Sequence, residues 1–226
     1  MTETSSYRAV MFDLDGTLLD TAADLGGALN RLRQEQGLPL LDEQRVRASV
    51  SNGAAALVKL GFGEEPGSVR FDELRARLLE IYMLHIADHT KAFTGINELL
   101  QWLTDKNLGW GIATNKPALY TEALLKQIHF PSPPGIVICP DHVTHRKPDP
   151  ESLLLAATHF KCAPEQIIYL GDHRRDIDCA KACGAASVAC TYGYIEADDD
   201  PAQWQADYTI DDPTQLTTLI RRMTRL

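Results

Sequence analysis

The sequence changes early from one short apolar run to a long helical periodicity. Residues 7–12 are largely apolar and end at an Asp-rich turn, which is typical of a buried parallel strand. Beyond this run, apolar residues such as Leu25, Leu29 and Leu32 recur three or four positions apart, as on one face of a helix. The predicted helices are residues 21–37, a segment after Asp42, residues 52–61 and residues 71–87. Little between residues 21 and 88 indicates a strand, so we expect a helical block there.

From about residue 91 onward the pattern alternates between helical segments and short apolar runs. The predicted helices are residues 96–106, 117–128, 150–160 and 176–183, and a last helix at the C-terminus. The predicted strands are residues 108–113, 136–139, 166–170, 187–190 and 208–210. Regular alternation of strands and helices predicts a parallel sheet that is covered by helices on both faces.

Together the two patterns predict an α/β fold, a Rossmann-like parallel sheet core with an inserted helical cap. We expect the core to comprise residues 1–19 and 90–226, and the cap to comprise residues 20–89. Ligands of open α/β sheets bind at the carboxyl ends of the strands. The insertion leaves the core at that end, so we expect the cap to act as a lid.

Composition narrows the classes of protein. Hydrophobic residues make up 44% of the 226 residues, enough for a substantial core. The formal net charge is −9 and the pI is about 5.2, which argues against a nucleic-acid partner because such proteins need a basic face. An anionic small molecule is still compatible with this charge, because a site can be locally positive inside an acidic protein.

Other features bear on where the protein works. The polar start, residues 1–6, lacks the basic and apolar stretches of a signal peptide. No apolar run approaches the roughly 20 residues needed to span a bilayer. The five cysteines are odd in number, and a chain of this length needs no disulfides, so reduced thiols are favoured. We therefore expect a cytoplasmic protein with no membrane partner.

Residues that could perform chemistry fall at four predicted strand ends or near them. These segments are Asp13-Leu14-Asp15-Gly16-Thr17, Thr114-Asn115-Lys116, Arg146-Lys147-Pro148-Asp149-Pro150 and Gly171-Asp172-His173-Arg174-Arg175-Asp176. Each segment alone has a purely structural interpretation: an ordinary turn, a helix cap, a solvated lysine or an acid at a helix start. Arg174 and Arg175 suit either contact with a substrate or a solvated helix start, and the latter is favoured.

Taken together, the four segments predict a metal site for phosphate chemistry. Carboxylates that converge at one sheet edge repel each other, so they imply a cation or raised pKa values. Mg²⁺ suits oxygen ligands with water and a substrate phosphate, whereas Zn²⁺ would require His or Cys. A carboxylate can attack phosphorus, and a second acid can protonate the leaving alcohol. Lys147 with Mg²⁺ would offset phosphoryl charge, while Thr114, Asn115 and backbone N–H groups near Leu14 would orient the group.

The same segments, in this order, resemble the four motifs of the haloacid dehalogenase superfamily. The helical insertion resembles the cap of its phosphoglycolate phosphatase-like branch, whose members act on small phosphorylated metabolites and are often monomers or homodimers. The resemblance implies these roles: Asp13 as nucleophile and metal ligand, Asp15 as general acid/base with its backbone carbonyl on Mg²⁺, Thr114 and Asn115 as phosphate-binding residues, Lys147 as the third-motif lysine, and Asp172 and Asp176 as metal-site acids.

Reaction type within the superfamily depends on Asp15. The resemblance implies a phosphatase or phosphomutase, because the members that cleave carbon–halogen bonds lack an Asp at this position. A phosphomutase would share every catalytic residue, although no clear basic specificity loop is seen in the cap. A non-catalytic binding protein would be expected to have lost Asp13, Asp15 or Lys147, and all are present. His173 departs from the family pattern, in which an Asp or a small polar residue is frequent.

The choice of phosphate ester depends on weaker signals. The turn formed by Ser51, Asn52 and Gly53 resembles a cap loop that lies over the site, and a plain helix start explains it equally well. Segments 138–143, 147–150 and 191–195, and Trp204 followed by Ala206-Asp207, resemble a group in this branch that acts on N-acetylmuramic acid 6-phosphate, with 2-phosphoglycolate as the alternative. Tyr192 and Tyr194 suit either a sugar-sized pocket or a structural role at a strand end.

Overall fold

The protein is organised around a six-stranded sheet whose middle strand β1 is Ala9–Phe12. The structure is a computed structural model and describes residues 7–226. The polar start that argues against a signal peptide therefore lies outside the described residues. Every residue of β1 is 0% exposed, as a strand covered on both faces of a sheet requires.

All six strands run in parallel, in the order β5-β4-β1-β6-β7-β8. The strands other than β1 are β4 Gly109–Ala113, β5 Ile136–Ile138, β6 Ile167–Gly171, β7 Ala186–Cys190 and β8 Tyr208–Ile210. The predicted α/β fold with a parallel sheet is therefore confirmed. Because the chain builds first to one side of β1 and then to the other, the strand order reverses beside β1, where ligands bind in such sheets.

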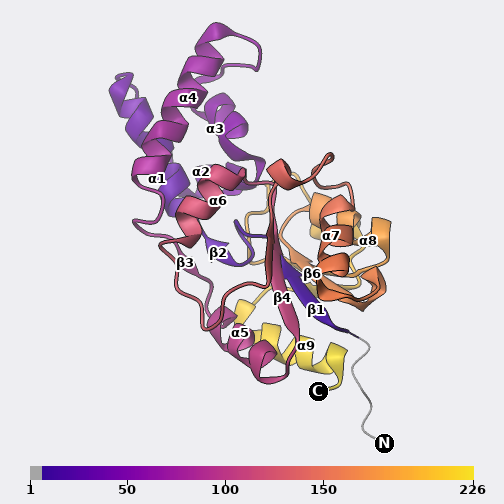
Figure 1. The fold of residues 1–226 in the computed structure, drawn as a ribbon. Coiled ribbons are helices and arrows are strands. Elements are labelled where there is room, and N and C mark those ends of the chain that lie inside the picture. Colours follow the sequence, from indigo (N-terminus) through magenta and orange to yellow (C-terminus); the bar gives the residue numbers. More distant parts are fainter. Residues whose placement is uncertain (1–6) are drawn as a thin grey trace, which may run out of the picture.

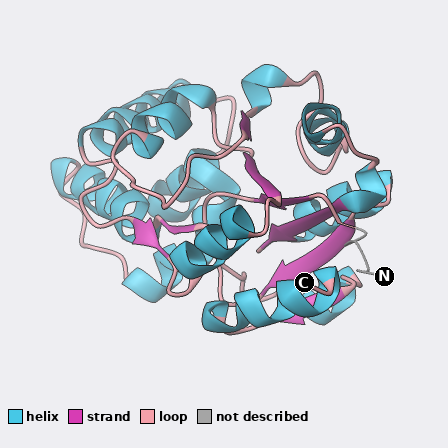
Figure 2. Cartoon of the chain, turned by 60° about the horizontal axis from the view of Figure 1, so that its bottom comes forward, coloured by secondary structure: helices cyan, strands magenta, loops and turns pink. Residues whose placement is uncertain are grey.

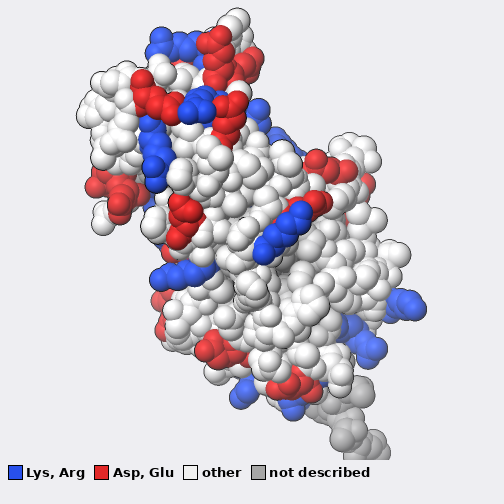
Figure 3. All heavy atoms as spheres, turned by 60° about the vertical axis from the view of Figure 1, so that its left-hand side comes forward, with Lys and Arg blue, Asp and Glu red and all other residues white. Residues whose placement is uncertain are grey.

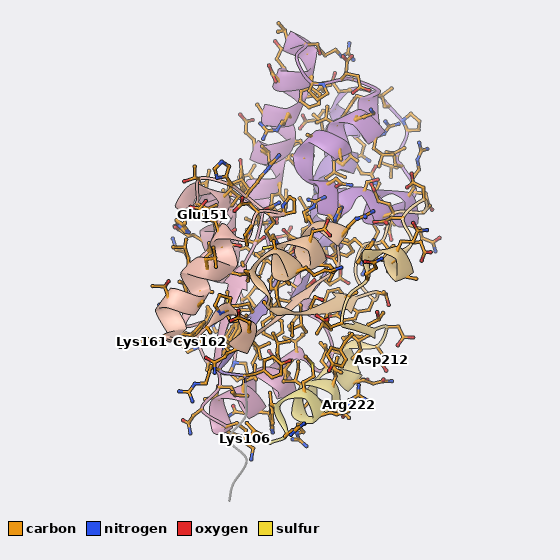
Figure 4. The ribbon with its side chains drawn as sticks, turned by 90° about the vertical axis from the view of Figure 1, so that its right-hand side faces the viewer. Lys106, Glu151, Lys161, Cys162, Asp212 and Arg222 are labelled. Carbon is orange, nitrogen blue, oxygen red and sulfur yellow. The ribbon has the colours of Figure 1, made fainter. Side chains whose placement is uncertain are left out.

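Helices cover both faces of the sheet (Figure 1, Figure 2). Helices α5 (Ile96–Asp105) and α9 (Leu216–Thr224) pack together on one face, and α7 (Glu151–Phe160) and α8 (Arg174–Cys183) pack on the other. Figure 4 shows that Glu151, at the start of α7, lies toward the inserted helices, whereas Lys106, just after α5, lies at the far end. The loops that enter the helices therefore gather at the end of the sheet nearest to the insertion.

The insertion is a bundle of four helices, seen at the top of Figure 1. Its helices are α1 Ala22–Glu35, α2 Glu43–Ser49, α3 Gly53–Phe62 and α4 Val69–Leu84. Asp42 accepts hydrogen bonds from the first backbone N–H groups of α2, and a short 3₁₀ helix, η1 (Val50–Asn52), joins α2 to α3. Helix α4 packs on α1 and α3 and buries Leu78 and Tyr82, each 1% exposed. These contacts give the insertion an apolar interior.

Two short strands at the base of the insertion are not predicted by the sequence pattern. Strand β2 (Leu19–Asp20) pairs antiparallel with β3 (Lys91–Ala92), where the chain leaves the sheet region and where it returns. Two-residue strands are too short to create a period-2 pattern. Helix α8 also begins two residues earlier than predicted, because the His173 side chain accepts a hydrogen bond from the backbone N–H of Arg175.

The surface carries both signs of charge. On the face in Figure 3, acidic and basic side chains are interspersed, with no broad basic area of the kind that binds nucleic-acid phosphates. Among the helices of residues 7–226, none is long and apolar enough to cross a membrane.

Candidate active site

Three neighbouring strands deliver polar residues to one edge of the sheet. Asp13 follows β1, Thr114 follows β4, and Asp172 follows β6. Strands β4 and β6 flank β1 in the sheet, so their carboxyl ends meet at the same edge. The predicted segments around these residues are thus brought together.

A glycine permits the turn after β1 to approach Asp172. Gly16 has φ +81°, and a Cβ at this position would collide with the Asp172 carboxylate and lie 2.9 Å from the Tyr194 ring. Any other L-residue would therefore meet both backbone strain and a clash. A glycine at position 16 is therefore required for the turn to pack against the end of β6.

Lys147 lies at the centre of the site and is 4% exposed. Its Nζ donates hydrogen bonds to the Ala113 carbonyl (2.9 Å), the Tyr169 hydroxyl (2.8 Å) and Asp176 Oδ1 (2.6 Å). It also forms an ion pair with Asp13 Oδ1 at 2.9 Å. Burial lowers the pKa of Lys147, but the neighbouring carboxylates outweigh burial and hold the pKa above its usual range, so the ammonium form persists.

Asp13 forms an ion pair with Lys147 that lacks the geometry of a well-oriented hydrogen bond. Its Oδ1 is buried and has no hydrogen-bond partner within residues 7–226, because the three donors of the Lys147 ammonium point to other acceptors. Burial is the main reason that the pKa of Asp13 rises to about 6, with Asp176 and Asp15 adding to the rise and Lys147 opposing it. An electron pair on this oxygen is left available.

Asp13, Asp172 and Asp176 form a cluster whose carboxylate oxygens lie within 4.8 Å of one another. Asp172 and Asp176 are both 0% exposed. Burial, followed by repulsion from Asp13 and Asp176, raises the pKa of Asp172 well above its usual range. A divalent cation with hard oxygen ligands would relieve this repulsion, and each of the three carboxylates can supply one ligand oxygen. The residues present therefore fit Mg²⁺.

Asp15 points away from this cluster toward Lys116, which was not predicted as a site residue. Lys116 Nζ lies 3.0 and 3.2 Å from the two Asp15 carboxylate oxygens, and the lysine side chain is 6% exposed. The ammonium also lies 4.8 Å from the centre of the Tyr82 ring. Lys116 therefore fixes the position of Asp15 beside the cavity. Its place directly after Thr114 and Asn115 is the signal that could have found it.

The remaining predicted core residues differ in how they reach the cavity. Thr114 and Asn115 both line it. Asn115 Nδ2 donates to the Lys147 carbonyl at 3.1 Å, which ties the second and third segments together. The side chain of Leu14 is fully buried in the core, so only the backbone of this residue could orient a phosphate.

The cap turn contacts the core directly. Ser51 Oγ donates to Asp172 Oδ2 at 3.1 Å, and Asn52 Nδ2 donates to Glu196 Oε1 at 2.6 Å. Gly53 lines the cavity beside them. These contacts show that the turn does more than start a helix.

Arg175 corrects the expectation of a solvated helix start. Its guanidinium donates to the Ser51 carbonyl at 3.2 Å and to Asn52 Oδ1 at 2.5 Å, so it joins α8 to the cap turn. Arg174 is 58% exposed and agrees with the expectation. The difference arises because successive residues of a helix face different directions.

His173 packs against Trp204 and contacts the start of helix α8. Its ring stacks on Trp204 with centroids 6.4 Å apart. Burial, followed by the charge of Arg175, lowers its pKa to about 4. A neutral imidazole at this position starts α8 and contacts the Arg175 side chain.

Tyr192 and Tyr194 hold the base of the cap and do not line the cavity. The Tyr194 hydroxyl donates to Asp20 at 2.8 Å and accepts from the backbone N–H groups of Thr21 and Ala22. The Tyr192 hydroxyl donates to the Thr17 carbonyl at 2.9 Å. Of the two interpretations that the sequence left open, the structural role applies.

A cavity of about 520 Å³ lies between the strand ends and the insertion. Its lining includes these residues from the core: Asp13, Asp15, Thr114, Asn115, Lys116, Pro117, Tyr120, Arg146, Lys147, Pro148, His173 and Arg175. Its lining from the insertion is Leu25, Val50, Ser51, Asn52, Gly53, Ala54, Ala55, Arg75, Leu79 and Tyr82. Another cavity of about 530 Å³, bordered by α1, α2 and residues 85–89, contains none of the strand-end residues.

This fold and cavity define a class of hydrolase with an acidic, lysine-containing site under a helical cap. The family model of haloacid dehalogenase-like hydrolases matches residues 10–190, and the chain belongs to this family. It is a phosphoric monoester hydrolase of the phosphoglycolate phosphatase-like branch.

Similar proteins support this placement. The chain is 41% identical over 215 residues to N-acetylmuramic acid 6-phosphate phosphatase of Pseudomonas aeruginosa, and the aligned region covers 95% of each chain. It is 38% identical over 209 residues to phosphoglycolate phosphatase of Xanthomonas campestris pv. campestris, and the aligned region covers 92% of this chain and 94% of the relative. The crystal structure of a predicted phosphoglycolate phosphatase from Haemophilus somnus shares the fold, with a TM-score of 0.82, 23% identity and coverage of 96% and 99%.

Proposed function

We propose that this phosphatase is Mg²⁺-dependent and acts through a phosphorylated Asp13. The observation that carries the proposal is the environment of Asp13 Oδ1. It lies 2.9 Å from the Lys147 ammonium, yet no hydrogen bond within residues 7–226 occupies it. A buried carboxylate oxygen with a free electron pair, adjacent to a cation, suits a nucleophile for phosphorus.

In the first half of the reaction, Asp13 attacks the phosphorus atom and the bond to the leaving alcohol breaks. The protonated Asp15 carboxyl group would donate its proton to the leaving oxygen. Lys147 offsets negative charge on the phosphoryl oxygens, while Thr114 and Asn115 orient them. The product is an aspartyl-phosphate and a free alcohol.

In the second half, the roles of Asp15 reverse. Its carboxylate would remove a proton from a water molecule that attacks the aspartyl-phosphate. The bond between Asp13 and phosphorus breaks, so that inorganic phosphate leaves and the Asp13 carboxylate is regenerated. Lys116 holds the Asp15 carboxylate at 3.0 Å in the position that both steps require.

Mg²⁺ would be held by Asp13, Asp172 and the backbone carbonyl of Asp15, with Asp176 beside them. When bound, it would supply positive charge to the phosphoryl group. The helical insertion, residues 20–89, would serve as the cap that closes the cavity and excludes water from the phosphorylated enzyme.

We infer that the substrate is N-acetylmuramic acid 6-phosphate, an amino sugar from the cell wall. Support comes from the 41% identity to the phosphatase named for this compound and from a cavity of about 520 Å³, which is within the range for binding a molecule of sugar size. The alternative is 2-phosphoglycolate, which is favoured by the relatives named phosphoglycolate phosphatase.

A direct comparison of kcat/KM for the two esters tests the substrate. We expect a preference of at least about tenfold for N-acetylmuramic acid 6-phosphate, which equals about 1.4 kcal/mol of transition-state binding. A tenfold preference for 2-phosphoglycolate would contradict the substrate proposal and leave the mechanism in place.

The variant Asp13→Asn tests the mechanism. An amide is a poor nucleophile, so we expect phosphate release to fall by about 10³-fold or more, while circular dichroism shows an intact fold. Full activity of this variant would exclude the aspartyl-phosphate route.

A further inference from the structure

Basic side chains outnumber acidic ones around the cavity. Its lining contains two carboxylates, Asp13 and Asp15, and these five basic residues: Arg75, Lys116, Arg146, Lys147 and Arg175. Three of the five have partners, because Lys116 binds Asp15, Lys147 binds Asp13, and Arg175 binds the cap turn.

The other two cavity arginines, Arg75 and Arg146, are unpaired. Their guanidinium groups have no hydrogen-bond or ion-pair partner within residues 7–226. A guanidinium presents a planar fork of donors that matches a carboxylate or a phosphate. The phosphoryl group already has Lys147 and the proposed metal. The unpaired arginines therefore point to a second anionic group on the substrate.

Helix α4 places Arg75 and the hydroxyl group of Tyr82 beside the same cavity. Arg75, Leu79 and Tyr82 occupy positions i, i+4 and i+7, one face of the helix, and all three line the cavity. Tyr82 is 1% exposed, and its hydroxyl donates no hydrogen bond within the described residues. The neighbouring Lys116 ammonium can only donate to this oxygen, so the hydroxyl proton is free for an acceptor atom of a ligand at the cap side.

Arg75 and Arg146 are both exposed side chains that border the main cavity. Arg146 also borders a separate outer hollow that is lined by His145 and Asp149. Arg75 shares its helix face with Tyr82, whose ring lies 6.1 Å from that of Tyr120 across the cavity wall. Arg75 is therefore the arginine that belongs with the leaving-group side of the site.

We propose that Arg75 is a specificity-determining residue that binds a carboxylate on the leaving alcohol, with the Tyr82 hydroxyl bound to a neighbouring substrate oxygen. This deepens the proposed function and rests on it. Both candidate leaving alcohols, N-acetylmuramic acid and glycolate, carry a carboxylate. Substrate choice would then require a second negative charge at the correct distance from the phosphate.

Matched pairs of esters test this role. N-acetylmuramic acid 6-phosphate and N-acetylglucosamine 6-phosphate differ only in the lactyl group that carries the carboxylate, and 2-phosphoglycolate is paired with ethyl phosphate. We expect Arg75→Ala to reduce the wild-type preference for the carboxylate-bearing member by about 10- to 100-fold, mainly through KM. Arg75→Lys restores part of the preference, because it keeps the charge without the fork.

Arg77→Ala is the control on the same helix. Arg77 is exposed, pairs with Glu35 and Glu80 and does not line the cavity, so the preference should stay unchanged. Tyr82→Phe, which removes only the hydroxyl, should lower kcat/KM about three- to tenfold.

Two outcomes would overturn the role of Arg75. One is an equal loss by Arg75→Ala for both members of a pair, and the other is a collapse of the preference in Arg146→Ala but not in Arg75→Ala. These outcomes differ from failure of the proposed function. If the wild-type protein released no phosphate from any of these esters or from p-nitrophenyl phosphate, the proposed function itself would be contradicted.

Discussion

At the scale of single residues, the Lys147 ammonium directs its hydrogen bonds to one set of acceptors and its charge to Asp13. The ammonium donates to Ala113, Tyr169 and Asp176, and it neutralises Asp13 from 2.9 Å. Asp13 Oδ1 therefore keeps lone pairs for attack on phosphorus while the ammonium offsets its charge. The Tyr169 hydroxyl accepts one hydrogen bond from the Lys147 ammonium and donates to the Ala113 carbonyl at 2.7 Å.

Asp15 forms an ion pair with the buried ammonium group of Lys116, and loss of this pair should slow the reaction. We expect Lys116→Ala to lower kcat by about 10- to 100-fold with a smaller effect on KM, because Asp15 loses its fixed orientation. The measurement is steady-state phosphate release, and Lys126→Ala, at an exposed position directly after helix α6 (Ala118–Leu125), is the control.

A double variant distinguishes a positioning role from a general one. If Lys116 acts through Asp15, then adding Lys116→Ala to Asp15→Asn should cost little further activity. Independent, multiplicative losses in the double variant would contradict a role through Asp15.

Sequence patterns alone identify the residues at strand ends but not these partners. Asp13, Thr114 and Asp172 could be predicted to meet because the ends of parallel strands share one edge. Lys116 binds Asp15 across 101 positions of sequence, and Arg175 binds Ser51 across 124. Such pairs depend on how two separately folded segments are oriented, which no local periodicity records.

At the scale of elements, long and strongly patterned segments are predictable and short ones are not. Three of the cap helices and the six sheet strands follow the pattern of apolar residues, within a few positions at their ends, and the remaining cap helix, α2, begins after Asp42 as expected. The β2–β3 pair at the base of the cap has only two residues in each strand. It forms because tertiary contacts bring the two cap connections together.

The cap turn and helix α8 form an element-scale contact that should control access to the site. Arg175 donates to the Ser51 carbonyl and to Asn52. We expect Arg175→Ala to lower kcat/KM about three- to tenfold and to speed hydrogen exchange in residues 50–53, because the turn loses its contact with the core.

Arg174→Ala is the matched control for the cap contact. Arg174 precedes Arg175 on the same helix, is 58% exposed and lies 3.8 Å from Asp178. Its loss should leave both kcat/KM and exchange unchanged. Unaltered exchange in residues 50–53 of Arg175→Ala would show that the turn is held by other contacts.

At the scale of the whole molecule, an acidic protein concentrates buried carboxylates at one point. Asp13, Asp172 and Asp176 come from a strand end, a second strand end and the first turn of α8. Their mutual repulsion opposes folding unless a cation is bound. The fold thus holds a site whose occupancy should affect the stability of the entire chain.

Mg²⁺ should therefore stabilise the protein as well as activate it. At a concentration one hundred times Kd, a ligand of the folded state adds about 2.7 kcal/mol to the free energy of unfolding, which for a chain of this length raises Tm by roughly 5–11 °C. Asp172→Asn should remove most of this rise, because it removes a charged ligand. Asp178→Asn, at an exposed position of α8, should keep it. EDTA should abolish phosphate release by the wild-type protein. An unchanged Tm on addition of Mg²⁺, together with full activity in EDTA, would mean that the carboxylate cluster does not bind a catalytic metal.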